Sequence, residues 1–291
     1  MTRNYDPVWK CIYCGETKEV LGKEHIVPLS LFGTIVLPRS SCDNCGKLTS
    51  QIERIANEKL FHSIRLIHNF PSRKPGERPT CLTFQSKIGT VLAPISNSFG
   101  TYPIFKLNEP GFLINHTKFD FDWVGCSLNS ITIKPQDPAL FKQFNSWTFS
   151  QEFDINTYAK LMVKIAHGFA SAELDIDNFD AWIPDILLNN KEELLPYVVG
   201  SLPNEDSPSN HTYELNYSIY PWEGGEGINH FIQVKIRLFA YMGGPTTTVI
   251  VGTTSNEGLD RIRKKIERNQ FLNMVGKVTK AYEPITINVV R

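Results

Sequence analysis

Two pairs of cysteines have the spacing of a tetrahedral metal site. Cys11 and Cys14 form one C-x-x-C pair, and Cys42 and Cys45 form the other, with 27 residues between the pairs. Four thiolates at this spacing can bind one Zn²⁺ if the intervening chain folds back on itself. The sequence therefore predicts a structural zinc site. The same four cysteines are also compatible with a zinc ribbon that only stabilises a small fold.

An acid and a histidine, Glu24 and His25, lie between the two cysteine pairs. Hydrolysis of a phosphodiester needs a base that activates water and a cation that offsets charge on the phosphate, and these side chains can contribute to both. Neighbouring side chains of a strand point to opposite faces, so Glu24 and His25 can share a site only at an irregular strand end. A lone histidine near a strand end is more often a surface or core residue than a catalyst.

The elements expected to position these residues are a hairpin followed by a helix. Residues 24–29 and 34–37 have extended patterns, and Ser30 to Gly33 can turn between them. Apolar residues recur near helical spacing from Lys47 to Phe61, which predicts a helix directly after the second cysteine pair.

The run Glu24-His25-Ile26-Val27-Pro28, flanked by C-x-x-C pairs, resembles the HNH (ββα-metal) endonucleases, especially the subgroup with C-I-Y-C-G and E-H-I-x-P motifs. The resemblance covers about 60 residues, a fifth of the chain. It implies a metal-dependent DNA endonuclease in which His25 is the general base and Glu24 a ligand of a catalytic Mg²⁺ or Mn²⁺. It also implies that Cys11, Cys14, Cys42 and Cys45 hold the structural zinc.

The last ligand of the catalytic cation is where the chain departs from this family. Many members have Asn or His directly after the final cysteine, and here that residue is Gly46. Asn44 is the better candidate, because the surrounding run is similar to the HNH module of RNA-guided CRISPR nucleases. Glu53, seven residues beyond Gly46 on the same helical face, is the competing choice. A helix-cap or turn role for Asn44 remains the alternative.

Three basic side chains, Lys47, Arg54 and Arg65, are candidates for contacts with DNA phosphates, although each can equally be a solvated helix residue. Residues 1–80 contain 12 Lys and Arg against 8 Asp and Glu, a formal charge of +4 in a chain that is neutral overall. A positive bias favours a phosphate-backbone partner, and a solvated surface is the alternative explanation.

The fold class expected is α+β, with a small zinc-stapled ββα-metal module followed by a larger α+β domain. We expect an HNH nuclease domain at 1–70, a Pro-rich hinge at 71–79, and a recognition or regulatory domain at 80–291. Short apolar stretches predict strands at 82–84, 88–93, 102–106, 111–114 and 130–133, and longer strands at 212–219, 230–240 and 246–252. Helices are expected at 154–173, capped by Asp154 or Asn156, and at 256–271.

We expect a cytoplasmic protein without a membrane partner, because the sequence has neither a long apolar run nor a signal-peptide pattern. DNA is the expected partner, with a homodimer or a regulatory protein as further possibilities, and bacterial defence, including antiviral defence, or restriction as the setting. Two alternatives stay open. One is a non-catalytic zinc-containing factor that binds nucleic acid or protein, and the other is a separate small-molecule enzyme in the second domain.

Overall fold

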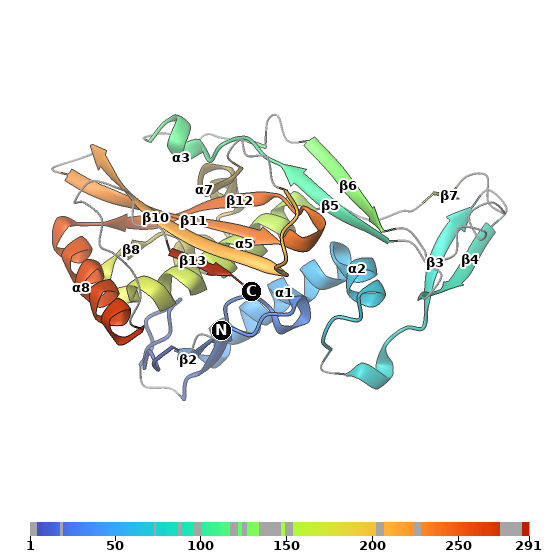
Figure 1. Cartoon of the computed structure of the whole chain (residues 1–291), viewed down its shortest axis with the longest axis horizontal. Helices are drawn as coiled ribbons and strands as arrows, with labels where there is room; N and C mark the ends of the chain where they lie inside the picture. Colours follow the sequence, from blue (N-terminus) through green and yellow to red (C-terminus); the bar gives the residue numbers. More distant parts are fainter. Residues whose placement is uncertain are drawn as a thin grey trace.

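The computed structural model describes residues 5–17, 20–72, 74–86, 89–95, 100–116, 122–123, 127–133, 147–148, 154–201, 207–223, 228–273 and 287–290. Its helices and antiparallel sheets make the chain an α+β protein, as the sequence predicts (Figure 1).

The N-terminal part of the chain is a hairpin followed by a helix. Strand β1 (Gly22–His25) pairs antiparallel with β2 (Val36–Ser41), and α1 (Asp43–Lys59) begins two residues after β2 ends. A short 3-10 helix, η1 (Leu29–Leu31), occupies the connection. The end of this loop requires glycine at position 33, because a Cβ there would lie 1.8 Å from the carbonyl oxygen of Val27. The predicted order of hairpin and helix is confirmed.

The middle of the chain forms small sheets near one end of the molecule (Figure 1). After α2 (His62–Ile67) and η2 (Pro75–Glu77) come two separate sheets, one with the order β4-β3-β7 and one pairing β5 with β6. Their strands are β3 (Cys81–Ser86), β4 (Gly89–Pro94), β5 (Gly100–Lys106), β6 (Ser127–Ile133) and β7 (Trp147–Thr148). The strand expected at 111–114 is wrong: this segment is a short helix, α3 (Gly111–Ile114), that starts after Pro110.

The C-terminal part contains the largest sheet, six strands in which β13, β10, β11, β12 and β8 are consecutive neighbours and β9 also pairs with β12. Its strands are β8 (Asp180–Ala181), β9 (Val199–Gly200), β10 (Tyr213–Glu223), β11 (Ile228–Leu238), β12 (Thr246–Thr254) and β13 (Ile287–Val290). The accompanying helices are α5 (Ile155–Leu174), α6 (Ile183–Leu188), α7 (Leu195–Val198), α8 (Asn256–Asn273) and the 3-10 turns η4 (Ile176–Asn178), η5 (Glu192–Leu194) and η6 (Ala240–Met242).

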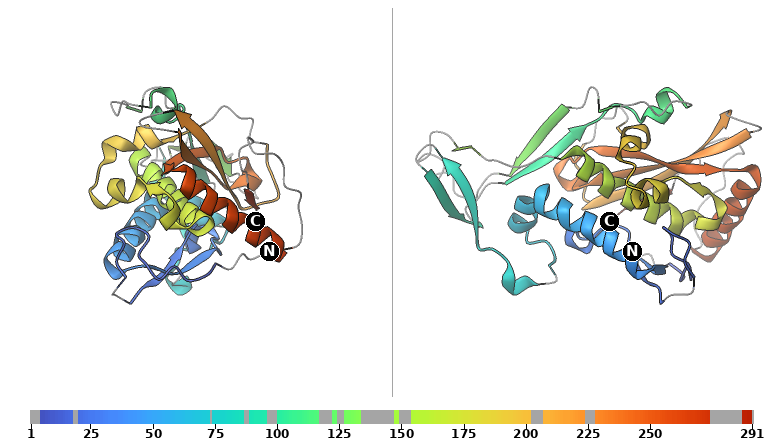
Figure 2. Two further views of the ribbon diagram at one scale, coloured as in Figure 1. Left: turned by 90° about the vertical axis from the view of Figure 1, so that its left-hand side faces the viewer. Right: turned by 180° about the vertical axis from the view of Figure 1, so that it is seen from behind.

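Helix α5 lies between the N-terminal elements and the large sheet. It packs against α1 on one side and against β11 and β12 on the other (Figures 1 and 2). Every residue from Thr157 to Leu174 is buried except Lys160, and Asp154 caps the helix by accepting a hydrogen bond from the backbone N–H of Asn156. One cluster of buried side chains therefore contains residues from the expected nuclease segment, such as Ile26 and Ile52, together with residues of α5.

His167 joins α5 to the first cysteine pair. Its side chain is fully buried, and its Nε2 lies 2.7 Å from the carbonyl oxygen of Ile12, between Cys11 and Cys14. Within the described residues Nδ1 has no hydrogen-bond partner, so a proton there would be buried without an acceptor. Burial accordingly lowers the pKa of His167 to about 4, although the hydrogen bond to Ile12 opposes this shift.

We predict that His167 makes the protein less stable in mild acid. Its pKa is lower in the folded than in the unfolded chain, so its contribution to stability is present above about pH 6.5 and is lost as the pH falls toward 4. Between pH 7 and pH 5 the free energy of unfolding should fall by about 2 kcal/mol more in the wild type than in His167→Gln. Urea unfolding of both proteins at both pH values measures this, and equal losses would contradict it.

Candidate metal centre and acid pair

The four cysteines predicted to bind zinc come together in the structure. Their sulfur atoms all lie within 4.8 Å of one another, and the Sγ atoms of Cys14 and Cys42 are 3.6 Å apart. Sulfur atoms bound tetrahedrally to one Zn²⁺ are separated by about 3.8 Å, from a Zn–S distance of about 2.3 Å. The donor set and its dimensions therefore fit a structural metal ion such as zinc.

Local backbone geometry builds this cluster. Gly15, with φ of +77°, closes the first C-x-x-C turn, and its N–H donates to the carbonyl oxygen of Cys11 at 2.9 Å. The second pair lies at the start of α1, where the N–H of Gly46 donates to the carbonyl oxygen of Cys42. Burial and the nearby Cys11 raise the pKa of the Cys45 thiol, so a bound cation is needed to keep all four sulfurs ionised together.

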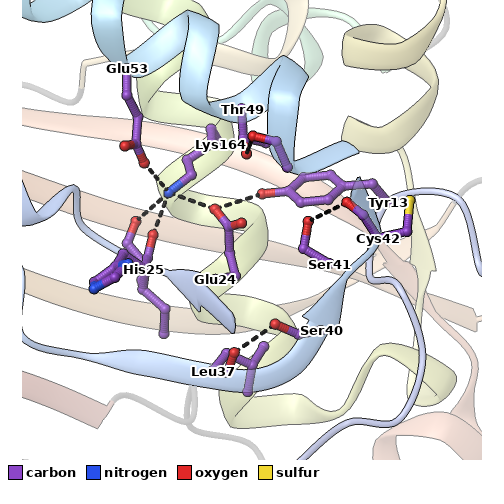
Figure 3. Close-up of polar contacts among 12 residues, drawn as sticks. Tyr13, Glu24, His25, Leu37, Ser40, Ser41, Cys42, Thr49, Glu53 and Lys164 are labelled. Atoms are coloured by element: carbon purple, nitrogen blue, oxygen red, sulfur yellow. Dashed lines mark hydrogen bonds and ion pairs between the residues drawn. The ribbon is translucent and has the colours of Figure 1, made fainter. Parts of the chain in front are cut away.

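A buried cluster of three charges lies beside the hairpin (Figure 3). The ammonium Nζ of Lys164, on α5, is 2.7 Å from Oε1 of Glu24 and 2.8 Å from Oε1 of Glu53. It also donates a hydrogen bond to the carbonyl oxygen of His25. The Lys164 side chain is completely buried, and the side chains of Glu24 and Glu53 are 5% and 21% exposed. One cation thus joins β1, α1 and α5.

The electrostatics of this cluster keep Lys164 charged. Burial disfavours the ammonium, but attraction to Glu24 and Glu53 and hydrogen bonds to them outweigh it, and the pKa of Lys164 is raised. Burial and the charge of Glu24 also raise the pKa of Tyr13 well above its usual range. Tyr13 therefore stays protonated, and its hydroxyl donates to Oε1 of Glu24 at 3.4 Å.

Glu24 and His25 lie on opposite sides of β1. Glu24 pairs with Leu37 and His25 with Val36 in regular antiparallel register, while the irregularity of the strand lies between Gly22 and Glu24. Glu24 is buried, His25 is half-buried, and the imidazole points away from the Glu24 carboxylate (Figure 3). The structure therefore does not bring these two side chains into one site.

The predicted ligands of the catalytic cation separate into two places. Glu53 shares a partner with Glu24, whereas Asn44 is exposed on the first turn of α1, beside the cysteines. Carboxylate and carbonyl oxygens are ligands that suit Mg²⁺ or Mn²⁺. In this arrangement, however, the Lys164 ammonium fills the position between the two carboxylates, so the residues do not fit a divalent cation.

The basic residues predicted to contact DNA also differ in their surroundings. Lys47 and Arg54 line an open hollow of about 700 Å³ together with Lys23, although Asp43 lines it too and Arg54 pairs with Glu58 at 2.8 Å. The residues that line this hollow do not include Glu24, His25 or Glu53. Arg65 is part-buried instead, and its Nε donates to the carbonyl oxygen of Ser30 at 3.1 Å, so it supports the hairpin loop.

Lys164 is the member of this charge cluster that the sequence did not predict. It is the only Asp, Glu, Lys or Arg between Leu161 and Ala172, and most of the residues around it in this run are apolar. A lysine in such a run is rarely buried without an acidic partner, and this pattern was the available signal. Nothing in the spacing of residues indicated which acids would meet it.

No protein-family model matches the chain, and no curated protein or solved structure is significantly similar to it. Among the described residues, no helix combines the length and the apolar character needed to span a membrane.

We predict that the purified chain contains about one zinc ion, because four thiolates converge on one point. Cys45→Ser should lower the zinc content to less than half and reduce thermal stability, since metal binding and folding of this region are coupled. Elemental analysis and thermal unfolding measure the two effects. Cys81→Ser is the matched control, since Cys81 lies on β3 outside the cluster, and an equal loss of zinc in both variants would contradict the assignment.

Proposed function

We propose that the chain is an HNH-type endonuclease that hydrolyses DNA phosphodiester bonds. The observation that supports this most is the β1-β2-α1 unit closed by four cysteines, with His25 at the end of β1. This is the order of elements that the resemblance to HNH nucleases implies. Bacterial defence or restriction is the proposed setting, with residues 80–291 providing specificity or regulation.

His25 is the proposed general base. Its imidazole is half-buried and lies apart from the charged cluster of Lys164, so it can approach solvent and accept the proton of an attacking water. In nucleases of this kind a divalent cation offsets the charge of the phosphate. The pair of Glu24 and Glu53 is closed to such a cation in this arrangement, because Lys164 fills the position between them.

The hollow at the start of α1 is the proposed contact surface for DNA. Lys23, Lys47 and Arg54 line it, and basic side chains around an open surface favour a phosphate backbone. Asp43 and the ion pair of Arg54 with Glu58 reduce this charge. We therefore expect modest, strongly salt-dependent affinity from this surface.

A second function is favoured by the charge cluster itself. With Glu24 and Glu53 paired to Lys164, and with Gly46 after the last cysteine, the same unit can serve as a non-catalytic zinc module that binds nucleic acid or protein. The two functions differ in one result, which is whether the purified chain cuts DNA in a way that depends on His25.

We expect the wild-type chain to nick supercoiled plasmid in the presence of Mg²⁺ or Mn²⁺. If His25 is the base, His25→Ala should lower the rate about 100-fold or more while leaving zinc content and DNA affinity unchanged. His62→Ala is the matched control, because His62 is an exposed histidine of α2 in the same part of the chain. Unchanged nicking by His25→Ala would exclude this role, and no nicking by any variant would favour the non-catalytic module.

Charge reversal in the hollow should weaken DNA binding. The double variant Lys23→Glu with Lys47→Glu should raise the Kd for a labelled duplex about tenfold or more at low salt and reduce the salt dependence, because fewer counterions are released. Fluorescence anisotropy measures both quantities. Lys74→Glu, which reverses an exposed lysine paired with Glu77 outside the hollow, is the control. Equal effects of the two changes would place the DNA elsewhere.

A further inference from the structure

The acid pair of Glu24 and Glu53 has the composition of a cation site. Two carboxylates approach one point from different elements, and the backbone carbonyl oxygen of His25 faces the same point. The carbonyl oxygen of Ile26 lies 3.4 Å from the same Nζ atom. An all-oxygen set with two negative charges is what hard divalent cations such as Mg²⁺ and Mn²⁺ bind.

The cation that fills this point belongs to the protein. Lys164 projects from α5, more than a hundred residues along the chain from Glu53, and its ammonium contacts the oxygens of all four residues. An ammonium offers one positive charge, so it offsets the two carboxylates only in part. A divalent ion would match their charge fully, but it cannot enter while the ammonium is there.

A direct role for Lys164 in binding phosphate does not agree with its burial. Its side chain is completely inaccessible, with the helix covered by α1 on one side and the sheet on the other. A phosphate group could reach Nζ only after α5 had moved away from the hairpin. The contacts of Lys164 are therefore directed at the acids and the neighbouring backbone carbonyls.

We propose that Lys164 is an internal substitute for a divalent cation, which closes the Glu24–Glu53 site to metal in this arrangement of the chain. The consequence for activity rests on the proposed nuclease function: with the site closed by Lys164, α5 keeps the rate of DNA cleavage low. The metal site itself is independent of that function. Metal binding and ammonium binding are mutually exclusive, so removal of the ammonium should open the site to Mn²⁺.

Mn²⁺ binding to the zinc-loaded full-length chain is the direct test. Free Mn²⁺ has a six-line electron paramagnetic resonance spectrum that weakens on binding, so a titration gives Kd and stoichiometry. We expect Lys164→Met to bind about one Mn²⁺ with a Kd at least about tenfold lower than that of the wild type. Lys164→Arg, which keeps the charge, should behave like the wild type. Lys160→Met is the matched control, since Lys160 is on the same helix and pairs with Glu192 instead.

Second variants identify the ligands. Adding Glu53→Gln to Lys164→Met should abolish the new Mn²⁺ site, whereas adding Asn44→Ala should leave it unchanged, because Asn44 is exposed and away from the acid pair. If Lys164→Met fails to fold, the wild type still tests the idea. Wild-type binding of Mn²⁺ that Glu24→Gln removes would overturn the proposal, and absence of such binding would support it.

Failure of this inference and failure of the nuclease proposal give different results. If Lys164→Met gains an Mn²⁺ site but no variant cuts plasmid DNA, the internal cation stands and the nuclease does not. If the wild type cuts with Mg²⁺ as fast as Lys164→Met, and both need His25, the nuclease stands and the inhibition by α5 does not. If Lys164→Met also gains no Mn²⁺ site, the internal cation is overturned as well. Faster cutting by Lys164→Met that His25→Ala abolishes would support both.

Discussion

The buried ammonium of Lys164 imposes the strongest constraint on how this chain packs. A lysine loses several kcal/mol of hydration when it is buried, and only close, well-placed carboxylates repay this loss. Glu24 and Glu53 provide them from β1 and α1, so the hairpin, the first helix and α5 must stay together to avoid leaving a buried charge unpaired. Their arrangement is therefore coupled through electrostatics as well as through apolar packing.

The same face of α5 makes a second polar contact with the N-terminal unit. His167 lies one helical turn beyond Lys164, and it meets the carbonyl oxygen of Ile12 in the first cysteine turn. The cysteine cluster closes the hairpin onto α1, while Lys164 and His167 attach that unit to α5. A continuous hydrophobic core surrounds these contacts, and it contains buried residues from both sides of residue 70.

This organisation gives the proposed chemistry an unusual setting. The acid of the E-H-I-x-P motif faces the protein interior, and the histidine faces the other side of β1. The motif thus serves two purposes here, since Glu24 contributes to the connection with α5 while His25 keeps access to solvent. A nuclease built in this way would depend on the position of α5, a helix that lies far from the motif in the sequence.

The sequence alone predicted what depends on local spacing. Paired cysteines indicated the metal cluster, apolar periodicity indicated the helices near 47–61 and 154–173, and extended segments rich in apolar residues indicated the hairpin and the strands of the large sheet. Local signals failed at 111–114, where four apolar residues are too few to distinguish a strand from a helical turn.

Only the tertiary structure decided the surroundings of the acids. Glu53 and Asn44 were competing candidates for the last ligand of the catalytic cation. Sequence spacing could not separate them, because it does not show that α5 packs over Glu53 and leaves Asn44 exposed. Lys164 meets Glu24 from a distant part of the chain, and the pairing arises because α5 is buried between α1 and the sheet, where its charge needs the nearest available carboxylates.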